Sequence, residues 1–342
     1  MGAPDGGPSI QNRLLPAGVV FVSDFAARGG FLLFSKETHA VICRDALSAL
    51  ALAALTATTA QASGRPSPDV VLEAQILLDR QHHSPGVIDG RLGSNTSRAV
   101  AAFKDAAGLP VNGKLDAEAM ARLRSSSDEP LLADYIIADG DVSGLVDVGD
   151  GMEAQASLDH LGFETVAEAL AERFHMSQAF LRRLNPEATF VAGETIKVVR
   201  PGKDELGTKV GRIEVDKGAS EVRAYDKAGH LLASYPGTIG SDTFPSPSGT
   251  MEVRTVAPAP TYYFDPSGRE WGPDKRLTIA AGPNNPVGST WIDLTKEGYG
   301  IHGSPDPRLI GKTASHGCVR LTNWDAAELG SAVEQGAAVT FL

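Results

Sequence analysis

Two short stretches near the C-terminal end hold residue types that together can perform acyl transfer. The first, residues 299–304, contains His302, and the second, residues 314–323, contains Cys318. The thiolate is the nucleophile of cysteine chemistry, but an unperturbed thiol, with a pKa of about 8.5, is mostly protonated at neutral pH. A neighbouring imidazole can remove that proton. Because sixteen residues separate the two side chains, they meet only if the loop between them folds back, and its glycines and prolines suit such turns.

The segment around these stretches has the pattern of a β-rich domain. From residue 207 onward, apolar or alternating runs separated by turn residues predict strands. The expected strands are 210–216, 221–226, 231–235, 251–256 and 291–294, and a helix over 324–335 and a strand over 338–342 end the chain. A Gly/Pro-rich stretch, 257–290, precedes the fifth strand. Since no βαβ rhythm is present, a Rossmann or TIM-barrel fold is excluded, and we expect one catalytic domain over 207–342.

The residues before this domain predict two small units joined by a connector. Residues 63–126 contain three helical patterns with turns at 84–90 and 108–114, and the Asp89 side chain is expected to bind local backbone amides. Residues 127–153 are rich in Gly and Asp and are interpreted as a linker, because their likeness to a calcium loop lacks the bidentate Glu. Residues 154–202 predict two helices, with Ser177 as N-cap of the second, and a strand over 195–199.

Gln81-His82-His83 is the other histidine-rich stretch of the helical part. A metal site here would need a third ligand at a matching spacing, which the sequence lacks. We therefore expect a solvated helix end.

Composition and the N-terminal region limit the expected partners and cellular location of the protein. The net charge of the 342 residues is −11, and no basic run is present, so nucleic acid is not an expected partner. Residues 1–62 are interpreted as an N-terminal extension that includes a signal peptide ending near Ala62, and its apolar run is too short to span a bilayer. Export to the periplasm or cell envelope would remove Cys43 and leave Cys318 as the only thiol, which favours a reactive over a structural cysteine.

The two C-terminal stretches resemble the signature of the L,D-transpeptidase (YkuD-type) catalytic domain. His302-Gly303 is followed by Ser315-His316-Gly317-Cys318-Val319-Arg320-Leu321-Thr322-Asn323, and Asn285-Pro286-Val287-Gly288 matches an upstream turn of the family. Residues 69–126 resemble a peptidoglycan-binding-like module, and 154–202 resemble a LysM-type unit or a spacer. The implied fold class is multidomain α+β: a three-helix module, a small α/β unit and a β-rich catalytic domain.

The resemblance assigns roles to the residues of the signature. Cys318 attacks the carbonyl before the terminal D-Ala of a tetrapeptide stem, and an amine acceptor then takes the acyl group. His302 is the base, Gly317 shapes a turn whose amides face the oxyanion, and Ser315 fixes His302. The resemblance also implies that five residues bind the substrate. Arg320 binds a carboxylate of the stem peptide, His316 orients the substrate and Tyr299 forms a wall of the cleft. Gly303 and Asn323 lie beside them, and Asn323 is also expected to hold the loop in place.

Several alternatives stay open at this point. The group that orients the His302 ring is Ser315, Gly300 or a backbone carbonyl. The Arg320 guanidinium binds either a carboxylate of the stem peptide or an Asp of the protein itself. Zinc held by His302, His316 and Cys318 lacks a fourth ligand, and the resemblance implies no metal or cofactor. An L,D-carboxypeptidase with the same site and a non-catalytic wall-binding scaffold are the competing functions. The expected partners are peptidoglycan stem peptides and glycan strands, and the protein is expected to be a monomer with no transmembrane segment.

Overall fold

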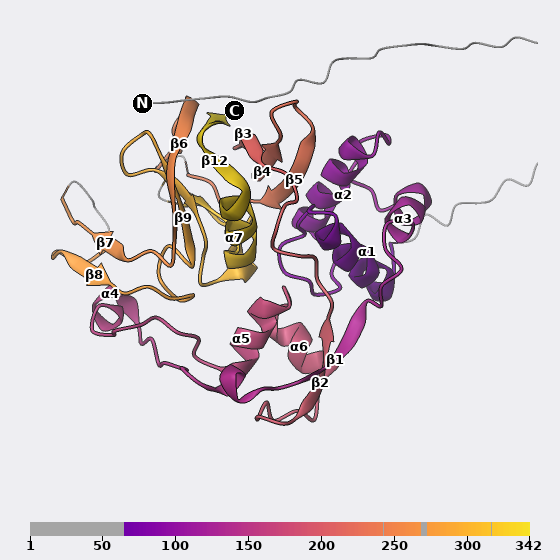
Figure 1. Ribbon diagram of the computed structural model, residues 1–342, viewed down its shortest axis with the longest axis horizontal. Helices are drawn as coiled ribbons and strands as arrows, with labels where there is room; N and C mark the ends of the chain where they lie inside the picture. The colour runs from indigo at the N-terminus through magenta and orange to yellow at the C-terminus, as the bar shows by residue number, and fades with distance from the viewer. Residues whose placement is uncertain (1–64, 242, 268–271, 316) are drawn as a thin grey trace, which may run out of the picture. The chain divides into compact units, whose positions relative to one another are not determined.

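The computed structural model describes residues 65–241, 243–267, 272–315 and 317–342 (Figure 1). The predicted signal peptide, Cys43 and His316 therefore lie outside the described residues. Within the ranges that are described, no helix has the length and apolar character that crossing a membrane requires.

Three helices form the first part of the described chain (Figure 1, indigo to purple). They are α1 (Pro68–Arg80), α2 (Ser94–Ala106) and α3 (Ala117–Arg124). Ser67 and Asp116 cap α1 and α3 with their side chains, which satisfies backbone N–H groups that a helix start leaves unpaired. The Asp89 carboxylate accepts from the Arg91 N–H at 2.8 Å, which confirms its predicted local role. Buried apolar side chains hold the helices together: Ala74, Leu77, Leu78, Ala99, Val100, Phe103, Met120 and Leu123.

The expectation of a solvated helix end at His82-His83 is wrong. His83 is 4% exposed, and its Nδ1 lies 3.0 Å from the Ser234 hydroxyl of the β-rich part. His82 Nδ1 lies 2.5 Å from the Glu328 carboxylate. Both partners are more than 150 residues away along the chain, so local sequence carried no sign of these contacts.

A small α/β unit comes next, and it recruits a strand from the predicted linker. Its elements are β1 (Leu132–Ile136), the 3-10 helix η1 (Asp139–Val142), α4 (Gly151–Gln155), α5 (Val166–Arg173), α6 (Gln178–Leu184) and β2 (Thr195–Val199). β1 pairs antiparallel with β2, from Leu132 opposite Val199 to Ile136 opposite Thr195. Ser177 caps α6 as predicted, by accepting from the Phe180 N–H. Asp141, considered for calcium, is buried and instead accepts from the Tyr135 hydroxyl and pairs with Arg173.

The catalytic part is built on one long sheet. In the described residues this sheet has eight strands in the order β11-β10-β9-β6-β12-β3-β4-β5. Their bounds are β3 (Val210–Asp216), β4 (Glu221–Tyr225), β5 (Leu231–Pro236), β6 (Gly249–Pro258), β9 (Thr290–Leu294), β10 (Gly300–His302), β11 (Val319–Arg320) and β12 (Val333–Phe341). Neighbours pair antiparallel except β10 with β11 and β12 with β3.

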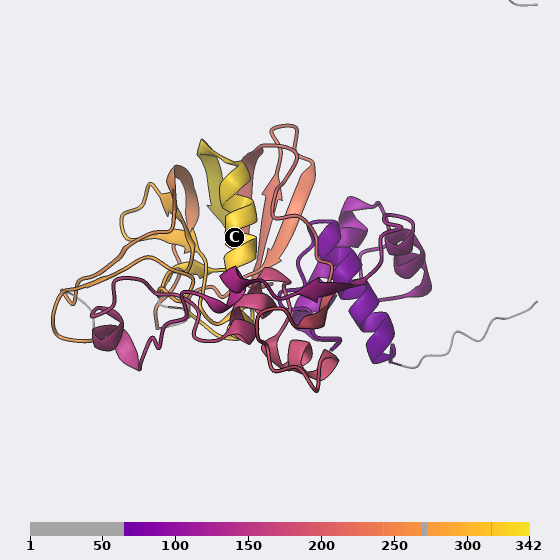
Figure 2. The same ribbon diagram turned by 60° about the horizontal axis from the view of Figure 1, so that its bottom comes forward.

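Two further features complete this part. The Gly/Pro-rich stretch contains a hairpin of β7 (Tyr262–Phe264) and β8 (Leu277–Ile279), and the 3-10 helix η2 (Pro307–Leu309) lies in the loop after β10. The helix α7 (Asn323–Ala332) packs on the sheet against β9, β6 and β10, as Figure 2 shows. The buried apolar face of the sheet includes Ile213, Val253, Ile292, Ile301 and Val319, which closes a single core under the site strands.

Candidate active site

The parallel pair β10 and β11 brings the two predicted stretches together. Ile301 lies opposite Val319 and His302 opposite Arg320. Ile301 and Val319 are fully buried in the core, so the alternation of a strand places His302 and Arg320 on the other face of the sheet. Cys318 directly precedes β11, two residues before Arg320, and shares that side by the same alternation. The predicted return of the loop is confirmed.

His302 is a buried imidazole held in one tautomer. It is 3% exposed and stacks on Trp291, with ring centroids 5.3 Å apart and planes at 23°. Its Nδ1 lies 2.7 Å from the Gly303 carbonyl oxygen. A carbonyl only accepts hydrogen bonds, so Nδ1 carries the proton and Nε2 has the lone pair. The group behind His302 is therefore the Gly303 carbonyl, whereas Gly300 leaves room for Trp291: a Cβ there would lie 2.5 Å from the indole.

Burial sets the charge state of this imidazole. The pKa of His302 is lowered from 6.5 to about 4: burial is the largest cause and the nearby charge of Arg320 adds to it, while the Gly303 and Val287 backbones act in the opposite direction. The desolvation cost falls on the charged form, which outweighs the carbonyl contacts that favour it. His302 is consequently neutral at physiological pH and has a vacant Nε2 to accept a proton.

Two serine hydroxyls hold the turn that carries Cys318. Ser315 Oγ donates to the Cys318 carbonyl at 2.5 Å and accepts from the Gly317 N–H at 3.2 Å. Ser246 Oγ donates to the Gly317 carbonyl at 2.7 Å and accepts from the Gly240 N–H at 2.9 Å. Cys318 itself is partly exposed, with Sγ 3.6 Å from the Gly298 carbonyl oxygen. Ser315 thus braces the cysteine turn, and no described contact joins it to His302.

Gly317 occupies a conformation and a space that suit only glycine. Its φ is +113°, and a Cβ at this position would lie 3.1 Å from Cε1 of Tyr299. The Tyr299 ring packs over the turn, with the Lys296 ammonium 4.7 Å from its centroid. The ring therefore forms a wall directly beside the cysteine turn.

Arg320 is held in β11 through its backbone. Its backbone forms a two-way bridge with Thr238, with both N···O distances 2.9 Å. Among the described residues, its guanidinium has neither a hydrogen bond nor an ion pair, so the competing internal Asp is not observed there. The guanidinium is nevertheless close enough to lower the pKa of His302.

Asn323 and Gly303 contact other residues of the protein. Asn323 is 3% exposed; its Oδ1 accepts from the Ser289 N–H at 2.9 Å, and its Nδ2 donates to Glu172 at 2.8 Å and to the Pro283 carbonyl at 3.1 Å. Every polar atom of its amide is thus engaged, as expected of a residue that ties the loop. Gly303 packs against that amide and supplies the carbonyl that orients His302.

Sequence reasoning missed two residues of this site, Ser246 and Glu172. Ser246 lies in the loop before β6, and its contact to Gly317 spans 71 residues. Glu172 lies outside the predicted catalytic domain altogether. His316 lies outside the described residues, so its predicted role stays a prediction. No group of three or more His, Cys, Asp or Glu in the described ranges is arranged to hold a metal ion.

Comparison with known proteins places this geometry in a family. Residues 211–340 match the L,D-transpeptidase catalytic domain (YkuD), and residues 67–123 match a putative peptidoglycan binding domain. A putative L,D-transpeptidase YkuD of Bacillus subtilis is 30% identical over 174 residues, which cover 50% of this chain and 90% of that protein. The chain belongs to the YkuD family of L,D-transpeptidases.

Two further proteins are similar to parts of this chain. The putative L,D-transpeptidase YkuD of Bacillus licheniformis is 29% identical over 176 residues, or 51% of this chain and 91% of that protein. Among solved structures, an L,D-transpeptidase from Mycobacterium smegmatis is 22% identical with a TM-score of 0.32, and the match covers 44% of this chain and 64% of that one. The multidomain α+β organisation, with a helical peptidoglycan-binding part before a β-rich catalytic part, agrees with the predicted fold class.

Proposed function

We propose that the protein is a peptidoglycan L,D-transpeptidase in which Cys318 is the nucleophile and His302 the base. The observation that carries the proposal is the parallel pairing of β10 and β11, which puts both side chains on one face of the sheet. His302 is neutral there, with its Nδ1 proton committed to Gly303. Nε2 is thus the atom that takes the thiol proton.

The reaction proceeds in two balanced steps. Sγ of Cys318 bonds to the carbonyl carbon before the terminal D-Ala as its proton passes to His302 Nε2. The C–N bond to D-Ala then breaks, and the imidazolium returns the proton to the leaving amine. In the second step the nitrogen of an amine acceptor bonds to the thioester carbonyl carbon as its proton passes to His302 Nε2. The C–S bond then breaks, and the imidazolium returns the proton to Sγ, which restores the thiol. Because burial disfavours imidazolium, proton transfer accompanies each attack rather than preceding it.

The surrounding residues have distinct roles in this scheme. Arg320 holds a carboxylate of the stem peptide, because its guanidinium lies near His302 and is unpaired among the described residues. Gly317 allows the sharp cysteine turn, which Ser315 and Ser246 brace. Tyr299 walls the cleft, and His316 is proposed to orient substrate.

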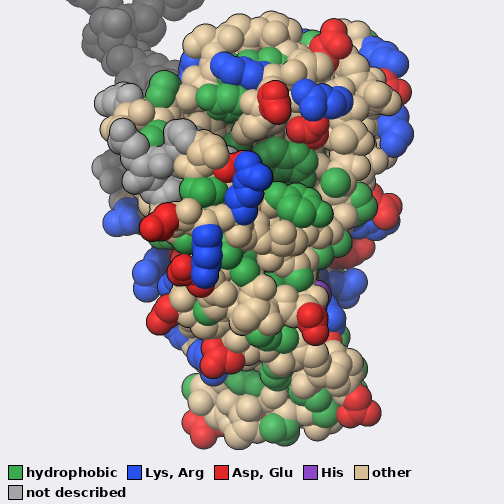
Figure 3. Space-filling view, turned by 90° about the vertical axis from the view of Figure 1, so that its left-hand side faces the viewer, with side chains coloured by type: hydrophobic (Ala, Val, Ile, Leu, Met, Phe, Trp, Pro, Cys, Tyr) green, Lys and Arg blue, Asp and Glu red, His purple; other side chains and the backbone are tan. Residues whose placement is uncertain are grey.

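The parts before the catalytic domain supply the setting. Residues 67–123 match a peptidoglycan-binding family, and we propose that the 63–126 module binds glycan strands outside the cytoplasm. Figure 3 shows the side of the molecule that lies on the left in Figure 1. On this side Lys and Arg are mixed with Asp and Glu, and neither charge is gathered into one large patch. Glycan binding by 154–202, with the β1 strand that completes its sheet, is a further proposal.

Muropeptide analysis tests the assignment. Purified peptidoglycan is incubated with wild type and with Cys318→Ala, and the products are identified by mass spectrometry. We expect 3→3 cross-linked dimers from wild type only. Tripeptide stems without dimers would indicate an L,D-carboxypeptidase instead. Sedimentation with sacculi, combined with a Cys318 that neither acts on stems nor reacts with thiol reagents, would indicate a non-catalytic scaffold.

A further inference from the structure

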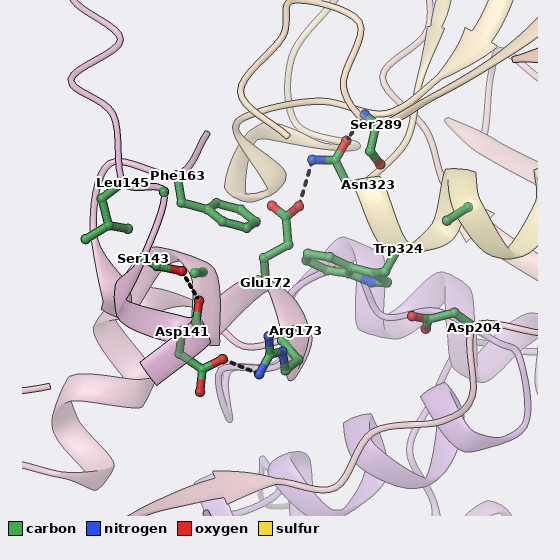
Figure 4. A pocket seen from close by; sticks show the side chains of 14 residues that line it. Asp141, Ser143, Leu145, Phe163, Glu172, Arg173, Asp204, Ser289, Asn323 and Trp324 are labelled. Atoms are coloured by element: carbon green, nitrogen blue, oxygen red, sulfur yellow. Dashed lines mark hydrogen bonds and ion pairs between the residues drawn. The ribbon is translucent and has the colours of Figure 1, made fainter. Parts of the chain in front are cut away.

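Glu172, a residue of α5, contacts the catalytic domain directly behind the candidate base. Its Oε1 accepts a hydrogen bond of 2.8 Å from Asn323 Nδ2, as Figure 4 shows. Asn323 is buried at the start of α7, so this bond joins the small α/β unit to the catalytic part in a site of low exposure. The contact spans 151 residues, and Glu172 lies outside both the transpeptidase signature and the 211–340 match, whereas Asn323 lies inside both.

The other end of the Asn323 amide holds the two turns that surround His302. Its Oδ1 accepts from the Ser289 N–H at 2.9 Å. The same oxygen lies close to two glycines. A Cβ added at Gly288 would lie 2.1 Å from it, and one added at Gly303 would lie 2.2 Å from it. These glycines belong to the two turns whose carbonyls face the imidazole: Val287 precedes the first, and Gly303 itself accepts from Nδ1. A shift of Asn323 is therefore transmitted to His302 through backbone contacts.

We infer that Glu172 is a positioning residue for His302, which acts through Asn323 and makes the small α/β unit part of the catalytic apparatus. The inference rests on the proposed role of His302 as base. Without the Glu172 acceptor, the Asn323 amide loses a partner in a buried setting and is free to rotate toward another. The two turns then lose their shared support, and the orientation of the His302 ring is no longer fixed.

The charges around Glu172 make this support depend on pH. The pKa of the Glu172 carboxyl is raised to about 7: burial is the largest cause and Glu168 adds to it, whereas Asn323 and His175 act in the opposite direction. Glu172 also lines two cavities of about 400 and 310 Å³. Charged groups there are Arg173 with its partner Asp141, Asp204, Glu164, and Arg308 with its partner Asp306. An ionised carboxylate accepts a stronger bond than a neutral carboxyl, so the hold on Asn323 strengthens as pH rises through 7.

Three variants of the full chain separate these effects. Glu172→Ala removes the acceptor, Glu172→Gln keeps an uncharged acceptor, and Glu164→Gln is the matched control, because Glu164 is an exposed acid of the same unit without contact to Asn323. The probe is imipenem, and mass spectrometry follows acylation of Cys318 between pH 5.5 and 8.5. We expect Glu172→Ala to slow acylation about tenfold, the effect of one lost hydrogen bond to a charged group. Glu172→Gln retains the low-pH rate and loses the extra rise through pH 7, and Glu164→Gln behaves as wild type.

Nitrogen NMR on histidine-labelled protein supplies the readout that a merely structural role would not change. The His302 resonances are assigned by their absence in His302→Asn. We expect the Nδ1–H tautomer to dominate in wild type and in Glu164→Gln, and a mixture of tautomers in Glu172→Ala. Unchanged His302 resonances in both Glu172 variants would overturn the inference, whether or not imipenem reacts. A wild type that imipenem does not acylate counts against the proposed function alone. If Glu172→Ala does not fold by circular dichroism, Glu172→Gln decides through its pH profile and resonances.

Discussion

The buried, neutral state of His302 leads to a sharp prediction about the pH dependence of Cys318 acylation. The perturbation is acidification of the wild-type protein in the presence of imipenem. With the pKa of His302 lowered from 6.5 to about 4, roughly 97% of the imidazole is still neutral at pH 5.5, whereas an imidazole of unperturbed pKa would be about 9% neutral. The base thus retains about a tenfold advantage at this pH.

The assay is the second-order rate constant for acylation, measured by mass spectrometry between pH 3.5 and 7. Because this constant reports the ionisation of the free protein, we expect the contribution of the base to stay level down to about pH 5 and to fall around pH 4. The additional, gentler dependence through Glu172 is removed by measuring the same profile in Glu172→Gln. Circular dichroism at each pH checks that the protein stays folded.

Two results would refute the reasoning. A loss of rate with a midpoint near pH 6.5 would show that His302 is exposed to solvent in the reacting protein and titrates normally. A tenfold fall per pH unit across the whole range would show that attack requires a thiolate formed beforehand, without proton transfer to His302 during attack. Either outcome rejects the mechanism in which a neutral, buried imidazole accepts the proton as the Sγ–C bond forms.

Two further predictions concern the cysteine turn and the buried charges. The variant Gly317→Ala has a backbone φ of +113° and places a methyl group 3.1 Å from the Tyr299 ring, so we expect imipenem to acylate it at least tenfold more slowly than wild type. The control is Gly298→Ala, which also has a positive φ but open space around the new Cβ. It should react faster than Gly317→Ala. His175 pairs with the buried Asp79 carboxylate at 3.1 Å, and the pKa of His175 is raised to about 10 by its acidic partners, against burial. The contribution of this ion pair to stability is full below pH 6.5 and is lost as pH rises through 10. The variant His175→Leu removes the cationic partner of Asp79 and leaves that carboxylate only the Gly202 N–H among the described residues, so it should lower the free energy of unfolding in urea by about 3 kcal/mol at pH 7. An unchanged value would mean that the pair contributes nothing.

Local sequence determined the elements and the chemistry of the signature. The strands at 195–199 and 210–216 form with the predicted bounds, because apolar alternation and turn residues act over a few positions. Ser177 caps its helix for the same reason, since a capping hydroxyl reaches N–H groups only three residues away. His302 and Cys318 are sixteen residues apart, so one loop that folds back is enough to bring them together.

Pairing between distant segments was decided only by the tertiary structure. β1 forms inside the predicted linker because β2, some sixty residues later, offers a partner strand, and His82 and His83 are covered by Glu328 and Ser234 rather than by water. Segments as short as these carry no local sign of such partners.

The same limit applied to the site. The residue types indicated a base and a nucleophile, but the pKa of His302 depends on burial by the surrounding core, and its tautomer depends on which carbonyl faces Nδ1. Ser315 is part of the signature, yet its hydroxyl braces the Cys318 turn instead of His302. Glu172 entered the site only because α5 packs against α7. Sequence therefore determined which groups are candidates for the chemistry, and the tertiary structure decided how they are charged, oriented and supported, because desolvation and long-range hydrogen bonds exist only once the chain has folded.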